Sequence, residues 1–332
     1  MWLYKKQETI PGYIGGQRWI IPEKTFVPAY LKLYEQDSSI FEERREKALK
    51  LLEECIVCPR DCRVNRLEDE HGICRSGRYA NVSSAFPHHG EEAGLRGRNG
   101  SGTIFFSFCN LKCVFCQNHE LSWQGQGTEL DAGQLAGLMI DLQNSGCHNI
   151  NFVTPEHVVP QLMEAIPIAV EKGLRVPLVY NTSAYDSMHS LELMDGIIDI
   201  YMPDFKFWDR ENARRFMAAE DYPDVAREAV REMHRQVGPL RFSEKGIALR
   251  GLLIRHLVMP EQTAGSDEIF RFLSNEISKD TWVNIMDQYR PDGMVLRKPD
   301  KYAEISRGIY RSEYDRAVRS ARSHGLYRFD NN

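Results

Sequence analysis

The sequence predicts an α/β fold: an incomplete (β/α)6 barrel of the TIM-like type with a small Cys-rich module at its N-terminus. Two observations lead to this prediction. From residue 103 onward, short apolar stretches alternate with stretches of helical period, which is typical of a mainly parallel sheet. In addition, seven of the eight cysteines fall within residues 55–116. Such clustering in a chain of this length indicates metal binding rather than a disulfide framework.

Composition narrows the class of protein. The 332 residues suffice for one large domain with an appendage, or for two domains. Hydrophobic residues make up 42% and charged residues 27%, as in ordinary globular proteins. The net charge of −5 argues against a nucleic-acid binder with a basic face. No apolar run approaches the ~20 residues of a membrane-spanning helix, and no signal-peptide pattern opens the chain. We therefore expect a cytoplasmic location and no membrane partner.

Six strands are expected in the barrel, each a short apolar stretch bounded by turn or polar residues. They are residues 103–106, 148–153, 175–180, 197–202, 250–259 and 282–286. A glycine-rich stretch, residues 79–102, is expected to be a loop that leads into the first strand. Its histidines and glutamates, which include His88, Glu91 and Glu92, could be ligands or acid–base groups, or could belong to a solvated linker.

Helices are expected between the strands and near both ends of the chain. They cover residues 41–55, 131–146, 157–172, 187–194, 209–219, 222–237, 266–278 and 312–324. Asp131 can cap the second of these helices and Gly146 can end it. Pro160 and Pro167 are expected to kink or divide the third. Residues 1–40 are expected to form an irregular arm.

Three parts are expected along the chain. Residues 1–85 would form the arm and a Cys-rich metal-binding module, and residues 86–291 the partial barrel. Residues 292–332 would add a C-terminal helical extension.

Three cysteines follow the first expected strand at the spacing C-x3-C-x2-C, namely Cys109, Cys113 and Cys116. Three thiolates on one short loop can hold three irons of a [4Fe–4S] cluster and leave the fourth iron open to another ligand. The alternatives are a zinc site or three unrelated thiols. Zinc in structural sites usually takes four nitrogen or sulfur ligands, and a fourth is missing nearby unless His119 serves.

A second group of cysteines, Cys55, Cys58, Cys62 and Cys74, precedes this motif. Four thiolates satisfy either a structural zinc ion or an auxiliary iron–sulfur cluster. The spacing does not choose between the two metals. A short loop-rich segment needs a staple to fold, which favours a structural role.

Polar residues close several of the expected strands. In parallel barrels the active site lies at the C-terminal ends of the strands. The residues in this position are Glu156, Asn181, Asp204, Lys206, His256 and the segment 284–290. Each could instead cap a helix or meet water, and His256 could be a satisfied core histidine. Asp204 and Lys206 both close a strongly apolar strand, which favours a functional role for the pair.

The cysteine motif, with Phe115 as an aromatic residue before the third cysteine, resembles the C-x3-C-x-aromatic-C signature of the radical S-adenosylmethionine (radical SAM) superfamily. The resemblance implies that the open iron chelates SAM. Reduced cluster would then cleave SAM to methionine and a 5′-deoxyadenosyl radical, and Phe115 would pack beside the adenine. The SAM-binding residues it implies are Phe115, Asn118, Glu156, Asn181, Asp204, Lys206 and His256.

Residues 100–290 look like the pyruvate formate-lyase activating enzyme branch of this superfamily. Residues 204–206 (Asp-Phe-Lys) are similar to its SAM-contacting Asp-Leu-Lys segment, and residues 255–260 to its later strand. The whole chain resembles uncharacterised homologues of those enzymes. The resemblance implies a reducing partner such as flavodoxin or ferredoxin, and a protein substrate, a glycyl radical enzyme.

Two features depart from that branch. Residues 154–156 (Thr-Pro-Glu) stand where activating enzymes often carry Gly-Gly-Glu, and the extra cysteines precede the signature motif instead of following it. The alternative to a radical SAM enzyme is a non-catalytic iron–sulfur electron-transfer protein or a zinc-stabilised binding protein.

Overall fold

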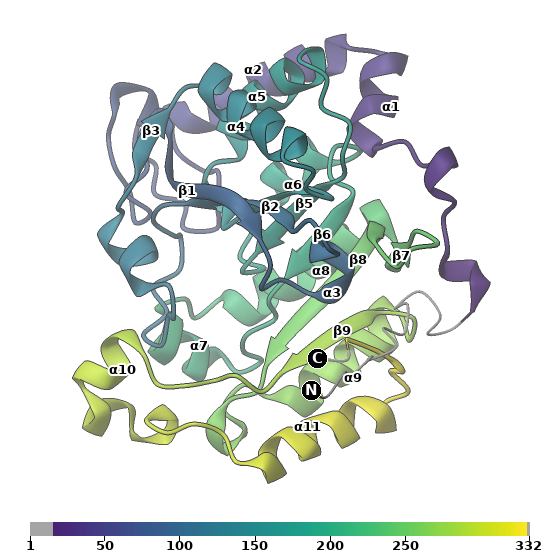
Figure 1. Cartoon of the computed structure of the whole chain (residues 1–332). Coiled ribbons are helices and arrows are strands. Elements are labelled where there is room, and N and C mark those ends of the chain that lie inside the picture. The colour runs from purple at the N-terminus through teal and green to yellow at the C-terminus, as the bar shows by residue number, and fades with distance from the viewer. Residues whose placement is uncertain (1–15, 331–332) are drawn as a thin grey trace, which may run out of the picture.

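Six neighbouring parallel strands form the centre of the computed structural model, which describes residues 16–330. They are β2 (Ser101–Phe106), β4 (Ile150–Val153), β5 (Leu178–Thr182), β6 (Ile200–Pro203), β8 (Ala248–Leu257) and β9 (Trp282–Met286). Each pairs in parallel with the next in this order. The six expected strands are confirmed, and with them the α/β fold. The sheet curves without closing, so the barrel is incomplete (Figure 1).

Four further strands extend this sheet. They are β1 (Ala80–His88), β3 (Thr128–Leu130), β7 (Arg241–Phe242) and β10 (Arg328–Phe329). β1 runs antiparallel to both β2 and β3. The expectation of a loop over the whole of residues 79–102 is therefore wrong. β1 lies outside the parallel core and only part of it is buried, so it lacks the apolar pattern of the other strands. It also crosses the boundary expected at residue 85.

Most of the helices lie on the outer side of the sheet, and the short α3 is an exception (Figure 1). They are α1 (Ala29–Gln36), α2 (Ser39–Glu53), α3 (Ala93–Arg96), α4 (Ala132–Asn144), α5 (Val159–Glu171), α6 (Met188–Met194), α7 (Arg210–Met217), α8 (Tyr222–Val237), α9 (Ser266–Phe272), α10 (Gly293–Arg297) and α11 (Arg311–Ser323). All the expected helices are present. Asp131 caps α4 by accepting from Gln134 N at 2.8 Å. α5 is one undivided helix, so the division expected at its prolines does not occur. Pro160 lies in its first turn, where no donor is needed, and Pro167 lies inside the helix without ending it.

The expected arm is only partly irregular. Residues 1–15 lie outside the described residues, and α1 occupies part of the remainder. The arm is joined to the barrel where the Ala29 amide donates to Asp199 Oδ1 at 2.8 Å. No helix among residues 16–330 has the length and apolar character needed to cross a membrane.

Apolar side chains form two layers, one on each face of the sheet. In β5, Leu178 and Tyr180 face the helices, whereas Val179 faces the barrel interior. The interior layer closes the N-terminal end of the barrel, and Leu95 from α3 is part of it. Its members are Leu95, Val179, Ile200, Met202, Leu240, Phe242, Ala248, Leu253 and Trp282. Because this layer is dry and packed, any cavity must lie above it, toward the C-terminal ends of the strands.

Gly251 in β8 provides a test of this packing. Its φ is +129°, and a Cβ placed on it would lie 2.4 Å from Leu240 Cα. We expect Gly251→Ala to lower the free energy of unfolding in urea by about 2–4 kcal/mol, from backbone strain and overpacking together. Gly137→Ala in α4 is the control, because a Cβ there meets nothing within 4 Å. It should raise stability by about 0.5–1 kcal/mol. Equal effects of the two substitutions would contradict the backbone placement at Gly251.

Candidate functional site

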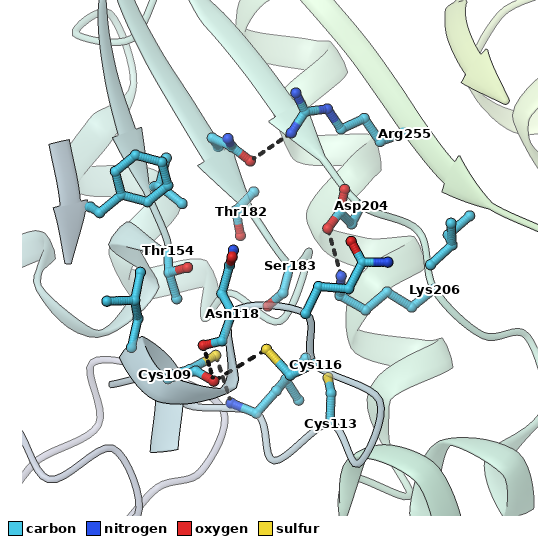
Figure 2. A pocket seen from close by; sticks show the side chains of 18 of the residues that line it. Cys109, Cys113, Cys116, Asn118, Thr154, Thr182, Ser183, Asp204, Lys206 and Arg255 are labelled. Carbon is cyan, nitrogen blue, oxygen red and sulfur yellow. Dashed lines mark hydrogen bonds and ion pairs between the residues drawn. The ribbon is translucent and has the colours of Figure 1, made fainter. Parts of the chain in front are cut away.

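A cavity of about 450 Å³ opens at the C-terminal ends of the parallel strands. The three cysteines that follow β2 line one end of it, and polar side chains at the ends of β5, β6 and β8 line part of the remainder (Figure 2). This is the place where the polar residues were expected to meet.

Backbone hydrogen bonds hold the cysteine loop in place. After β2 the chain turns at Phe108, whose φ is +66°. The Val114 amide donates to Phe216 O at 2.9 Å, and the Lys112 amide donates to Met217 O at 3.2 Å. Both acceptors belong to α7, so this helix supports the loop from outside the cavity. Within the loop, Cys109 Sγ accepts from the Leu111 amide at 3.3 Å.

The thiols of Cys109, Cys113 and Cys116 all line the cavity, and their sulfur atoms lie near one another in Figure 2. Burial, and then the neighbouring Glu156 carboxylate, raises the pKa of Cys109. Burial likewise raises the pKa of Cys113 to about 12. Such thiols become thiolates when a metal supplies the compensating charge.

The donor set fits a [4Fe–4S] cluster with one open iron. Among residues 16–330, no three Cys, His, Asp or Glu side chains stand close enough to share a single metal ion. In such a cluster the three cysteines would each hold a separate iron. His119 does not line the cavity; its ring stacks on Trp123 at 5.2 Å.

Five of the SAM-binding residues implied by the resemblance line the cavity. They are Phe115, Asn118, Asn181, Asp204 and Lys206. Lys206 Nζ donates to Asp204 Oδ2 at 2.5 Å (Figure 2). Burial lowers the pKa of Lys206, but the negative charges of Asp204 and Cys113 have the opposite and larger combined effect. The net pKa lies above its ordinary value, so the ammonium stays charged. The pair offers a cation and a carboxylate beside the cysteines.

Glu156 does not line the cavity, so the expectation that it contacts a ligand there is wrong. Its side chain is fully buried. Its Oε1 accepts from the Ser183 amide at 2.6 Å and from Ser183 Oγ at 2.5 Å. Thr154 and Ser183 line the cavity instead (Figure 2). Because Pro155 and Glu156 enter a short 3₁₀ turn, the carboxylate turns inward and supports the strand end of β5.

His256 lies on the opposite face of β8 from the cavity, so its predicted site role is also wrong. Successive residues of a strand point to opposite faces, and here Arg255 and Leu257 face the cavity. His256 Nδ1 donates to Phe205 O and its Nε2 accepts from Ser266 Oγ, both at 2.8 Å. This outcome is the alternative given in the sequence analysis, a core histidine with both ring nitrogens hydrogen-bonded.

The second cysteine group gathers beside the first. Cys55, Cys58 and Cys74 are buried and Cys62 is partly exposed. Burial, followed by the charge of Cys74, raises the pKa of Cys58, so these thiols lie within electrostatic range of one another. Gly72 allows this approach, since a Cβ there would lie 2.7 Å from Cys62 Sγ.

Asn110 joins the two cysteine groups. Its carbonyl oxygen accepts from Arg60 Nε at 2.7 Å. Its side chain is a hydrogen-bonding neighbour of the Cys58 thiol, and its Oδ1 lies 3.9 Å from Cys109 Sγ. The Cys-rich module is thus in contact with the loop at the cavity.

Several polar residues that line the cavity lie outside the predicted SAM-binding set. They include Arg255, Asn284, Glu91 and Glu92. From the sequence, the two glutamates were placed in a loop that could be either part of a site or a solvated linker. Asn284 was placed at a strand end. Arg255 directly precedes His256, which was predicted as a site residue. Both faces of β8 are apolar and buried, so the alternation carried no signal that would have selected Arg255 over His256.

Residues 103–273 match the Radical SAM superfamily. The uncharacterized protein MJ0674 of Methanocaldococcus jannaschii is 30% identical over 289 residues, which is 85% of this chain and 78% of that protein. This chain therefore belongs to the radical SAM superfamily. Its members are enzymes that use a [4Fe–4S] cluster and SAM.

Solved structures show looser similarity. SuiB of Streptococcus suis bound to precursor peptide SuiA is 12% identical, with a TM-score of 0.43, over 65% of this chain and 44% of SuiB. The hydrogenase maturase HydG of Carboxydothermus hydrogenoformans is 13% identical, with a TM-score of 0.43, over 68% and 51%. Methylornithine synthase PylB is 14% identical, with a TM-score of 0.43, over 67% and 62%. The chain spans less than two thirds of the length of each of these three proteins.

The environment of His256 predicts a pH effect on stability. Burial lowers its pKa from 6.5 to about 4 in the folded protein. Between these values the unfolded chain binds a proton that the folded protein does not bind, so the free energy of unfolding falls as pH falls. Urea unfolding at several pH values should show that His256→Gln reduces this slope by up to about 1.4 kcal/mol per pH unit. An unchanged slope in His256→Gln would mean that the ring is not held neutral.

Proposed function

We propose that this protein cleaves SAM reductively and that the resulting radical removes a hydrogen atom from a substrate. Membership of the superfamily and the three thiols at one end of the cavity support this proposal most strongly. When bound, the cluster would supply one electron that divides SAM into methionine and a 5′-deoxyadenosyl radical. The electron would come from a protein donor of the flavodoxin or ferredoxin type. A cytoplasmic location is part of the proposal, since such thiols need a reducing compartment.

The residues of the cavity have separate roles in this proposal. Cys109, Cys113 and Cys116 would hold the cluster. Lys206 is charged and can bind the SAM carboxylate, while Asp204 can accept from the amino group or the ribose. Asn118 and Asn181 offer further polar contacts.

Phe115 also lines the cavity. The centre of its ring lies 5.8 Å from that of Phe207 and 6.1 Å from that of Tyr289. It can pack beside the adenine. The residues thus supply position and electrostatics, while the cofactors supply the chemistry.

We propose a polypeptide as the substrate, specifically a glycine Cα in a glycyl radical enzyme. The similarity of residues 204–206 and 255–260 to the activating enzymes supports this choice. The Thr-Pro-Glu segment and the N-terminal position of the extra cysteines distinguish this chain from those enzymes.

The formation of 5′-deoxyadenosine tests the proposed reaction. Protein reconstituted with iron and sulfide, then given dithionite and SAM, should produce this nucleoside, which chromatography can measure. Cys113→Ala should lower its yield at least about a hundredfold, because the cluster loses one of its three ligands. Cys147→Ala is the matched control, because Cys147 is buried outside both cysteine groups.

The alternative, a non-catalytic electron carrier or zinc-stabilised protein, predicts a different result. An intact cluster whose EPR spectrum does not change on addition of SAM, and which forms no 5′-deoxyadenosine, would support that alternative.

We also propose that Cys55, Cys58, Cys62 and Cys74 draw together on metal binding to hold a second metal centre, either zinc or an iron–sulfur cluster. Arg66 supports this assignment. Its side chain is 1% exposed, and within residues 16–330 its hydrogen-bond acceptors are two carbonyl oxygens and Cys55 Sγ. Its Nη2 has no partner among the same residues. A buried cation needs a compensating anion, and four thiolates around either metal carry net negative charge.

Loss of this compensation should loosen the second metal. We expect Arg66→Met to release zinc or iron to a chelator at least about tenfold faster than wild type, measured by mass spectrometry of the metal that remains bound. Arg63→Met is the control, because Arg63 is exposed and pairs with Asp61 at 2.6 Å. Cys113→Ala lacks one ligand of the first cluster. The element that remains bound in this variant therefore identifies the second metal. Equal release from the two arginine variants would contradict the role of Arg66.

A further inference from the structure

The end of the cavity away from the cysteines is formed by charged and amide side chains. Arg255 of β8 stands there, and Figure 2 shows it across the cavity from Cys109. Glu91 and Glu92, from the connection between β1 and α3, both bind its guanidinium. Asn284 of β9 joins them by donating from Nδ2 to Glu92 Oε1 at 2.8 Å. We call these four residues the polar floor.

The cations of the polar floor are already paired with its carboxylates. Arg255 is bound by both glutamates, and His88 lies 3.5 Å from Glu91. Burial opposes the ionisation of Glu91, but Arg255 and His88 lower its pKa to about 2, so it is ionised at neutral pH. A carboxylate or phosphate ligand would find no unpaired cation among these residues. The floor therefore favours a neutral polar group.

The hydrogen-bonding atoms left free in the polar floor are one acceptor and one donor. Because the Glu92 carboxylate can only accept, Asn284 must turn its amide nitrogen toward it. Asn284 Oδ1 then has no partner among residues 16–330, although the side chain is only 4% exposed. The Nη1 group of Arg255 makes one long contact, 3.5 Å to Asn181 Oδ1. Arg255 and Asn284 are direct neighbours in the register of β8 and β9, so these free atoms lie on the same face.

We infer that the polar floor binds the N–H and C=O of a neutral amide-bearing substrate, the N–H donating to Asn284 Oδ1 and the C=O accepting from Arg255 Nη1. In an extended residue these two groups point to the same side, and the Cα lies between them. A glycine held in this way would have its Cα fixed beneath the cysteine end of the cavity. The inference rests on the proposed function, because it takes the ligand at the floor to be the substrate of the radical.

A primary carboxamide also presents an N–H and a C=O on one side, so two sources share this chemistry. N-acetylglycine N-methylamide represents a peptide residue, and acetamide represents a small carboxamide. N-acetylglycine is the matched charged probe, because a carboxylate replaces its second amide. Ligand-observed NMR with the reconstituted protein and SAM measures the affinity for each probe.

We expect the neutral glycine probe to bind at least about fivefold more tightly than N-acetylglycine and than acetamide. Asn284→Leu removes the acceptor at similar volume and should weaken its binding at least about fivefold. Asn284→Ser, which keeps an oxygen acceptor, should recover part of the loss. Arg255→Lys keeps the positive charge but loses the planar guanidinium with its fixed N–H donors. It is the substitute variant if Asn284→Leu does not fold. The exposed Asn144 is the control position for an Asn-to-Leu change.

Three results would overturn the inference. They are equal or tighter binding of N-acetylglycine, unchanged binding in Asn284→Leu, and no binding of any probe to protein that forms 5′-deoxyadenosine. Acetamide binding as tightly as the glycine probe would support the amide site but assign it to small carboxamides.

A second readout separates the inference from the proposed function. With deuterium at the glycine Cα and dithionite present, deuterium should appear in 5′-deoxyadenosine, detected by mass spectrometry. Binding with the expected preference but without any 5′-deoxyadenosine would contradict the proposed function and leave the amide site standing.

Discussion

The ion pairs between Arg255 and the glutamates Glu91 and Glu92 are the interaction on which the interior of the barrel depends. The sheet is open, with no pairing of β1 or β3 to β9 or β10. Glu92 reaches across this gap to both Arg255 and Asn284. The connection after β1 is thereby held against the far edge of the sheet. A buried arginine needs such partners, because an unpaired buried charge is strongly destabilising.

This connection also divides the interior into layers. Leu95 follows the glutamates and packs with Val179, Leu253 and Trp282 in the apolar layer that closes the N-terminal end of the barrel. The polar floor lies above that layer, and the cavity separates it from the cysteine loop. A substrate bound in this cavity would therefore lie between the polar floor and the cysteine loop.

The two cysteine groups form one continuous assembly on the other side of the cavity. Asn110 lies between Cys58 and Cys109, and Arg60 binds its carbonyl oxygen. Removing the Cys-rich module would thus expose the back of the loop that carries the signature motif. The position of the extra cysteines before the motif, which departs from the activating enzymes, still brings them into contact with it.

The cysteine motif and the six parallel strands could be predicted from sequence, because both depend on local order. Three thiols at short spacing must lie near one another in any fold, and buried strands have strongly apolar stretches. β1 escaped prediction because its partner strand, not its own pattern, stabilises it. Asn181, Asp204 and Lys206, which were predicted at strand ends, do line the cavity.

Only the tertiary structure decided which face each strand presents to the cavity. Arg255 and His256 are neighbours in a strand buried on both sides, so sequence alternation cannot tell which one points inward. The pairing of Glu92 with Asn284 joins residues far apart in the chain, and no local pattern encodes such a contact. The sequence by itself determined the cofactor chemistry and the order of the six parallel strands. Packing around an open barrel decided where a substrate can bind, because that depends on the orientation and charge of side chains from several strands at once.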